Sequence, residues 1–109
     1  TIENGCLEVC GGHNKLGLIG EFWEPLSEKI TKDMEFVHFA AKPGDCMFFD
    51  CFTPHRSNPN MSDVSRSNFY LTYNPASQGD HRELYLSEKR ISFPPDNERA
   101  PGQSYKYRV

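Results

Sequence analysis

Short runs of β-branched and aromatic residues, bounded by turn residues, limit the folds that this chain can adopt. Three of them are residues 34–41 (MEFVHFAA), 46–52 (CMFFDCF) and 66–74 (RSNFYLTYN). Strands typically have this length and composition. The turn sequence KPGD separates the first two runs, and the polar stretch 54–65 precedes the third. An earlier run, residues 5–12, predicts a further strand that ends at Gly11 and Gly12.

Two segments favour helices instead. Pro25 can occupy the first turn of a short helix over residues 26–33, because the N–H that proline lacks is not needed there. Asp80 is expected to cap a helix over residues 81–90, with Glu83 completing a capping box. The proline-containing tail predicts extended chain. This order of elements favours a mainly β fold, the C-terminal portion of a double-stranded β-helix (jelly-roll or cupin-like) with one or two short helices.

The chain opens close to a turn. Asn4-Gly5 is a strong hairpin-turn sequence, yet only residues 1–3 precede it. We therefore expect a chain that begins in the middle of a fold. Its 109 residues are at most one domain. The prediction is a partial domain over residues 1–109, in which residues 75–109 form a helix and an extended tail.

Composition excludes several classes of protein. The 37% hydrophobic content suits a globular chain, and the net charge of −3 argues against a face for nucleic acid, which needs a basic excess. No apolar stretch is long enough to span a bilayer, and no signal peptide is recognisable. We expect a soluble cytoplasmic or otherwise intracellular protein that binds neither nucleic acid nor membrane.

Four cysteines invite a metal or disulfide interpretation. The spacings C-x3-C and C-x4-C differ from the C-x2-C pairs typical of structural zinc sites. Cys6 and Cys10 would share one face of a strand, whereas Cys46 and Cys51 would point to opposite faces. The favoured interpretation is four buried, reduced thiols that act as small apolar side chains. Zinc binding and disulfides remain the alternatives.

The stretch TPHRSNPNMSDVSR places a histidine at the end of one predicted strand. Pro54 restricts the backbone directly before His55. A histidine in such a position can present Nε2 at the mouth of a barrel as a metal ligand. The pattern alone leaves an ordinary loop histidine as the alternative.

Arg66 opens the next predicted strand, eleven residues after His55. It shares a face with polar residues, while the other face of that strand is apolar. If the apolar face packs outward, the guanidinium points into the barrel and needs an anion. That anion is Asp50, Asp63 or the carboxylate of a bound ligand. A surface arginine remains the alternative.

Three segments together, ENGCLEVCGGH, KPGDCMFFDCFTPHRSNPN and SRSNFYLTYN, resemble the C-terminal half of the phytanoyl-CoA dioxygenase family over about residues 1–75. These enzymes are Fe(II)- and 2-oxoglutarate-dependent oxygenases. The resemblance implies that His55 is the distal iron ligand of a two-His-one-carboxylate triad. It implies that Arg66 binds the far carboxylate of 2-oxoglutarate and that Ser57 hydrogen-bonds the same group. The tail is similar to a branch with small, phosphonate-type substrates.

The other histidines match the family less well. His13 lies where the family has Gly-Ser-His, with Gly12 as the middle residue here, so it is interpreted as structural or as lining a pocket. His38 is interpreted as a core or pocket-wall residue and His81 as a solvated helix residue. The loop 13–33, which carries Phe22 and Trp23, is a candidate lid.

One departure from the family pattern is decisive. The other two iron ligands form a His-x-Asp pair, and this chain contains no such sequence; His81 and Glu83 would not face one site on a helix. The chain thus supplies one of three ligands and is expected neither to bind iron tightly nor to turn over alone. The full-length protein is expected to hydroxylate a small organic substrate, phosphonate-like or acyl.

Two other functions stay open. The first is a non-catalytic jelly-roll module that binds a partner, since exposed sheet edges are templates for pairing and a homodimer could complete the sheet. The second is a structural domain stabilised by zinc on the cysteines. An upstream His-x-Asp sequence favours the enzyme, and stoichiometric zinc after purification favours the zinc domain.

Overall fold

The computed structural model describes residues 1–22 and 24–105 and divides the chain into two compact units. The first unit is Thr1–Phe69, and the second begins at Tyr70. The only sheet in the described residues belongs to the first unit, and the longest helix belongs to the second. In the described part of the chain, none of the helices has the length and apolar character needed to cross a bilayer.

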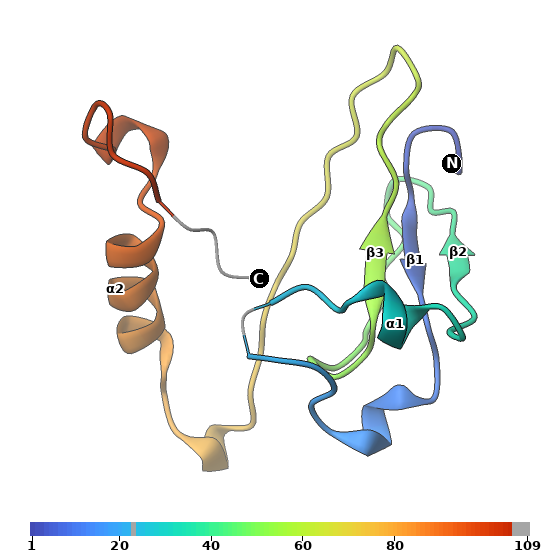
Figure 1. Cartoon of the computed structure of the whole chain (residues 1–109), viewed down its shortest axis with the longest axis horizontal. Coiled ribbons are helices and arrows are strands. Elements are labelled where there is room, and N and C mark those ends of the chain that lie inside the picture. The colour runs from blue at the N-terminus through green and yellow to red at the C-terminus, as the bar shows by residue number, and fades with distance from the viewer. Residues whose placement is uncertain (23, 106–109) are drawn as a thin grey trace. The chain divides into compact units, whose positions relative to one another are not determined.

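The first unit is built around a small antiparallel sheet with β1 in the middle (Figure 1). Its strands are β1 (Leu7–Val9), β2 (Val37–Phe39) and β3 (His55–Ser57). The register places Glu8 of β1 opposite His38 of β2 and opposite Arg56 of β3. The main chain extends the contact between β1 and β3, because Cys10 N–H donates to Pro54 O at 2.9 Å.

The two faces of this sheet differ in composition. Residues directly opposite each other in an antiparallel pair lie on the same face. One face therefore carries Glu8, His38 and Arg56, and the alternation along β1 adds the buried thiols of Cys6 and Cys10. The other face carries Leu7, Val9, Val37, Phe39, His55 and Ser57. The two candidate site residues of β3 thus share a face.

The predicted strands are only partly right. β1 and β2 lie within the runs 5–12 and 34–41 but are shorter. Residues 46–52 and 66–74 form no strand, and β3 lies in the stretch 54–65 that was expected to be a loop. High β propensity identifies residues that suit a pleated surface, but a strand forms only where a neighbour pairs with its backbone. In this unit, β1 supplies that neighbour to β2 and β3.

The two predicted helices are confirmed with shifted bounds. They are α1 (Glu28–Thr31) and α2 (Arg82–Ser92), accompanied by the 3-10 helices η1 (His13–Leu16), η2 (Ala76–Gln78) and η3 (Asp96–Glu98). Pro25 lies before α1 and outside its first turn.

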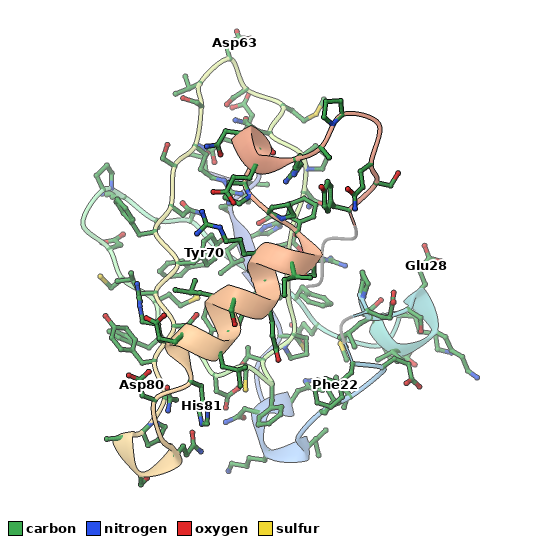
Figure 2. The ribbon with its side chains drawn as sticks, turned by 90° about the vertical axis from the view of Figure 1, so that its left-hand side faces the viewer. Phe22, Glu28, Asp63, Tyr70, Asp80 and His81 are labelled. Carbon is green, nitrogen blue, oxygen red and sulfur yellow. The ribbon has the colours of Figure 1, made fainter. Side chains whose placement is uncertain are left out.

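The predicted capping box is wrong, because His81 holds the N-cap position of α2 without a side-chain cap. Asp80 Oδ1 instead accepts the N–H of Arg82 at 3.0 Å (Figure 2). The tail, expected to be extended throughout, contains η3.

The turn predicted at Asn4-Gly5 is confirmed. The Gly5 N–H donates to Ile2 O and the Cys6 N–H donates to Thr1 O, both at 3.0 Å. Gly5 adopts a φ of +69°, in the left-handed region that favours glycine. The turn also contacts the segment after β3, because Met61 N–H donates to Glu3 O at 3.0 Å.

Few apolar side chains are buried in the described residues. Cys6 and Cys10 are buried, as are Pro54 and Pro94, and Glu8 lies between the two cysteines with 3% of its surface exposed. Large aromatic side chains elsewhere are open to solvent, among them Phe48 at 91% and Phe69 at 96% exposed. The sheet therefore buries the carboxylate of Glu8 on its central strand and has little apolar core.

Candidate functional site

The imidazole of His55 is oriented by a backbone hydrogen bond. Its Nδ1 lies 3.0 Å from Thr53 O, and a carbonyl oxygen only accepts hydrogen bonds. In the neutral imidazole this contact favours the tautomer with the proton on Nδ1 and the lone pair on Nε2. The ring also packs against Phe49, with centroids 5.0 Å apart and a tilt of 53°. Histidines that bind metals usually have this arrangement, in which the second nitrogen donates to a carbonyl or carboxylate.

Asp50 organises the turn that precedes His55. Its Oδ1 accepts the N–H of Phe52 at 3.1 Å and the hydroxyl of Thr53 at 2.9 Å. The main-chain N–H of Thr53 also donates to Asp50 O at 3.2 Å. Asp50 thereby holds Thr53, whose carbonyl orients His55. The sequence had suggested a different role for Asp50, as an ion-pair partner of Arg66. The indication in the sequence was local, because aspartate frequently hydrogen-bonds the backbone two residues later in a turn.

Ser57 and Arg66 meet beside the sheet. Ser57 lies two residues after His55 on β3, so both side chains are on one face. Arg66 is half-buried, and its Nη1 donates to Ser57 Oγ at 3.5 Å. The structure thus brings together two of the three candidate site residues and places the third on the same face.

The anion expected for Arg66 is not a nearby aspartate. In residues 1–22 and 24–105, Arg66 forms no ion pair with Asp50 or Asp63. Asp63 lies at the tip of the loop that follows β3 (Figure 2). The carboxylate of a ligand and a surface arginine therefore remain the two alternatives.

A buried carboxylate on the opposite face was not predicted from the sequence. Glu8 Oε2 accepts a hydrogen bond from Arg56 Nε at 2.9 Å, and Glu8 Oε1 accepts one from Asn58 Nδ2 at 2.5 Å. His38 Nδ1 lies 3.8 Å from Glu8 Oε1. The guanidinium of Arg56 also lies over the ring of Phe36, 4.1 Å from its centroid. The sequence pattern held one indication, since Glu8 has the same parity along β1 as the buried cysteines.

The remaining histidines have local partners. His13 Nδ1 lies 3.2 Å from Gly11 O and 3.5 Å from Cys10 Sγ. His38 lies at the exposed surface of β2 rather than in a core. His81 is exposed, as predicted, and its Nε2 donates to Gln78 O at 2.5 Å.

The cysteines are all free thiols. Cys6 and Cys10 are buried, as expected, but Cys46 and Cys51 are exposed, so the prediction of four buried thiols is wrong for these two. Both lie in the run 46–52, which forms no strand and therefore gains no sheet to cover it.

The described residues contain no group of three or more His, Cys, Asp or Glu side chains able to hold a metal ion. His55 nevertheless fits an iron site, because its oriented ring offers one neutral imidazole nitrogen. In the candidate lid, residues 13–33, the structure has η1 and α1 and leaves Phe22 72% exposed. Trp23 lies outside the described residues.

Comparison with known proteins identifies the family. The family model described as "Phytanoyl-CoA dioxygenase (PhyH)" matches residues 1–68. A 2-aminoethylphosphonate dioxygenase from the uncultured bacterium HF130_AEPn_1 is 35% identical over 106 residues, which are 94% of this chain and 40% of that protein. A methylphosphonate hydroxylase from Gimesia maris is 36% identical over 94 residues, 85% of this chain and 36% of that protein.

A third relative, a dioxygenase from Epichloe uncinata, is 31% identical over 98 residues, 89% of this chain and 38% of that protein. The chain thus spans roughly two-fifths of the length of these relatives. No solved structure matches it. The family model covers well over half of the chain, including His55, Ser57 and Arg66. The chain therefore belongs to the phytanoyl-CoA dioxygenase family.

Proposed function

We propose that the full-length protein is an Fe(II)- and 2-oxoglutarate-dependent dioxygenase that hydroxylates a small organophosphonate. The observation that carries this proposal is the arrangement on one face of β3. His55 has Nδ1 tied to Thr53 O and Nε2 free to bind a metal, and the hydroxyl of Ser57 accepts from Arg66 beside it. Such a site requires a ligand for the metal and a pair of groups that binds the carboxylate of the co-substrate.

His55 would hold the iron through Nε2. A two-His-one-carboxylate site leaves open positions on Fe(II) for co-substrate and oxygen. His55 supplies one of its three ligands, and we propose that the other two come from a His-x-Asp sequence outside these 109 residues. The hydrogen bond to Thr53 O would increase the basicity of the ligand and fix the ring plane.

Arg66 and Ser57 would hold the far carboxylate of 2-oxoglutarate. A guanidinium can donate two parallel hydrogen bonds to a carboxylate, and the hydroxyl of Ser57 can donate a third. The 3.5 Å contact between Arg66 and Ser57 leaves both groups within reach of one oxygen atom. When bound, iron with its 2-oxo acid supplies the oxidising power for C–H hydroxylation, and the protein orients the target bond.

The relatives support the substrate class of this proposal. Two of them are named for phosphonates, 2-aminoethylphosphonate and methylphosphonate. We propose that residues 1–109 form part of one jelly-roll domain, with β1, β2 and β3 belonging to its sheets and residues 75–109 to a helix and tail. We also propose that the protein acts in the cell interior on a small-molecule substrate.

The test is turnover by the full-length protein. Succinate and hydroxylated product are measured with Fe(II), 2-oxoglutarate and a panel of alkylphosphonates, with acyl thioesters as the competing class. The variant Arg66→Ala should raise the KM for 2-oxoglutarate about ten- to hundredfold, because charge-assisted hydrogen bonds contribute about 1.5–3 kcal/mol each. Arg82→Ala, at the exposed start of α2, is the matched control and should leave that KM unchanged. An unaltered KM in Arg66→Ala contradicts the role of Arg66.

A second candidate is a non-catalytic module that binds another protein or a second copy of itself. Exposed aromatic side chains favour it, since Phe48 and Phe69 are 91% and 96% exposed. β2 and β3 also each have one edge without a neighbouring strand among the described residues. A module of this kind would bind no iron, and if its partner is a second copy of itself it would form a dimer detectable by light scattering.

A further inference from the structure

The buried carboxylate of Glu8 is joined to β3 by two side chains on one face of the sheet. Arg56 lies in β3 opposite Glu8 and donates to Oε2 at 2.9 Å. Asn58, directly after β3, donates to Oε1 at 2.5 Å. Both oxygens of a side chain with 3% exposure are therefore occupied by groups from the same stretch of backbone.

This stretch is the one that carries the candidate site. Side chains alternate between the faces of a strand, so His55 and Ser57 lie on one face while Arg56 and Asn58 lie on the other. Arg56 stands between the two site residues, and Asn58 follows Ser57. Fixing Arg56 and Asn58 on one face fixes the pleat that presents His55 and Ser57 on the other.

Other contacts restrict Arg56 further. Its guanidinium lies over the ring of Phe36, 4.1 Å from the centroid, so the group is held by both a ring and a carboxylate. From the strand on the other edge of β1, His38 Nδ1 lies 3.8 Å from Glu8 Oε1. Glu8 thus contacts side chains from both strands that flank it.

Strand pairing alone does not account for a buried charge at this position. Burying a carboxylate carries a desolvation cost, and its partner Arg56 keeps 54% of its side chain exposed, so the pair adds little stability and a leucine could hold the sheet as well. A carboxylate differs from leucine in accepting directional hydrogen bonds, and here it accepts two from residues that flank Ser57. The arrangement favours a role in placing groups rather than in stability.

We propose that Glu8 is a positioning residue for the candidate iron and 2-oxoglutarate site. Through Arg56 and Asn58 it sets the orientation of β3 and so the spacing between His55 Nε2 and the Ser57–Arg66 pair. The inference rests on the proposed function, because it concerns the same site. It adds a residue on the far face of the sheet, distant from the reacting groups.

The test compares Glu8→Gln and Glu8→Leu with wild type in the full-length protein. Fe(II) and 2-oxoglutarate are titrated without oxygen, and the visible charge-transfer band of the chelate reports binding without turnover. Both variants should raise the Kd for 2-oxoglutarate about fivefold, which is less than the 10- to 100-fold typical of direct partners of a metal ligand. Glu98→Gln removes an exposed ion pair of α2 and is the matched control, with an unchanged Kd.

A double-variant comparison separates positioning from stability. The single variants Glu8→Leu and Arg56→Leu are compared with the double variant Glu8→Leu/Arg56→Leu. If Glu8 acts through Arg56, the Kd of the double variant for 2-oxoglutarate should be no higher than the higher of the two single-variant values. All titrations are made well below the unfolding midpoint of each variant, so a loss of stability alone leaves Kd unchanged. The isosteric Glu8→Gln decides the question if the leucine variants do not fold.

The outcomes distinguish this inference from the proposed function. If wild type binds iron and 2-oxoglutarate and Glu8→Gln binds them with the same Kd values, the positioning role is overturned and the proposed function stands. A wild-type protein that binds neither overturns both.

Discussion

At the scale of single residues, Gly5 is the glycine that tolerates a side chain least. Its φ is +69°, and a Cβ at this position would lie 2.2 Å from Asn58 O, a backbone atom that cannot rotate away. Gly12 has a similar φ of +83°, but a Cβ there would meet no described atom within 4 Å beyond its chain neighbours. The two glycines thus share the conformational requirement and differ in the space around them.

We expect Gly12→Ala to lower the free energy of unfolding by about 1–2 kcal/mol, the cost of a left-handed conformation for an L-residue. Gly5→Ala should lower it clearly more, because the segment around Asn58 must also move. Urea unfolding of the two variants and wild type measures both. Equal losses would show that the contact between Gly5 and Asn58 does not restrict the turn.

The site residues differ in how far the sequence could predict them. His55, Ser57 and Arg66 could be selected as candidates because they match a motif of the family that the chain resembles. Glu8 could not, because only the pairing of β1 with two other strands shows which face is buried. Its partners Arg56 and Asn58 lie 48 and 50 residues away along the chain.

At the scale of elements, the end of α2 is joined to η3 by an ion pair between Arg90 and Glu98. Arg90 Nε donates to Glu98 Oε2 at 2.7 Å, and a second contact joins Arg90 Nη2 to Oε1. The hydrogen bond from Arg90 lowers the pKa of Glu98 below its ordinary value, and the same bond to Glu98 raises the pKa of Arg90. The carboxylate is therefore more acidic in the folded unit than in the unfolded chain.

This shift predicts a pH dependence. A lowered folded-state pKa contributes stability that is fully present above the unfolded pKa and is lost as pH falls through the folded value. Glu98→Gln should therefore destabilise α2 slightly at neutral pH and approach wild type as the pH falls below the ordinary glutamate range. The effect is small because the pair is exposed and screened.

The measurement is hydrogen exchange of the α2 amides between neutral and acidic pH. Glu88→Gln, an exposed change on the same helix, is the matched control and should show no such convergence. A difference between Glu98→Gln and wild type that persists or grows at acidic pH contradicts the role of the pair.

Elements were predictable where local chemistry decides them. The helix at 81–90 could be placed within two residues of α2, because helical hydrogen bonds lie within one segment. The runs 46–52 and 66–74 have stronger β composition than residues 55–57, yet only the latter pair with β1. Strand formation depends on a partner elsewhere in the chain, which composition does not reveal.

At the scale of the whole molecule, the proposed iron site is divided between His55 and ligands outside these 109 residues. The chain spans roughly two-fifths of the length of its relatives, and large aromatic side chains of the first unit are exposed. We expect the full-length protein to bind iron tightly and the 109-residue chain alone to bind it weakly or not at all.

The most direct test is anaerobic calorimetry of Fe(II) and 2-oxoglutarate binding to the full-length protein and its His55→Ala variant. His81→Ala, which removes an exposed histidine at the start of α2, is the matched control. If His55 is an iron ligand, wild type and His81→Ala bind both ligands, and His55→Ala loses iron and with it 2-oxoglutarate. Binding of both ligands by His55→Ala with wild-type affinity, or by none of the proteins, would contradict that role.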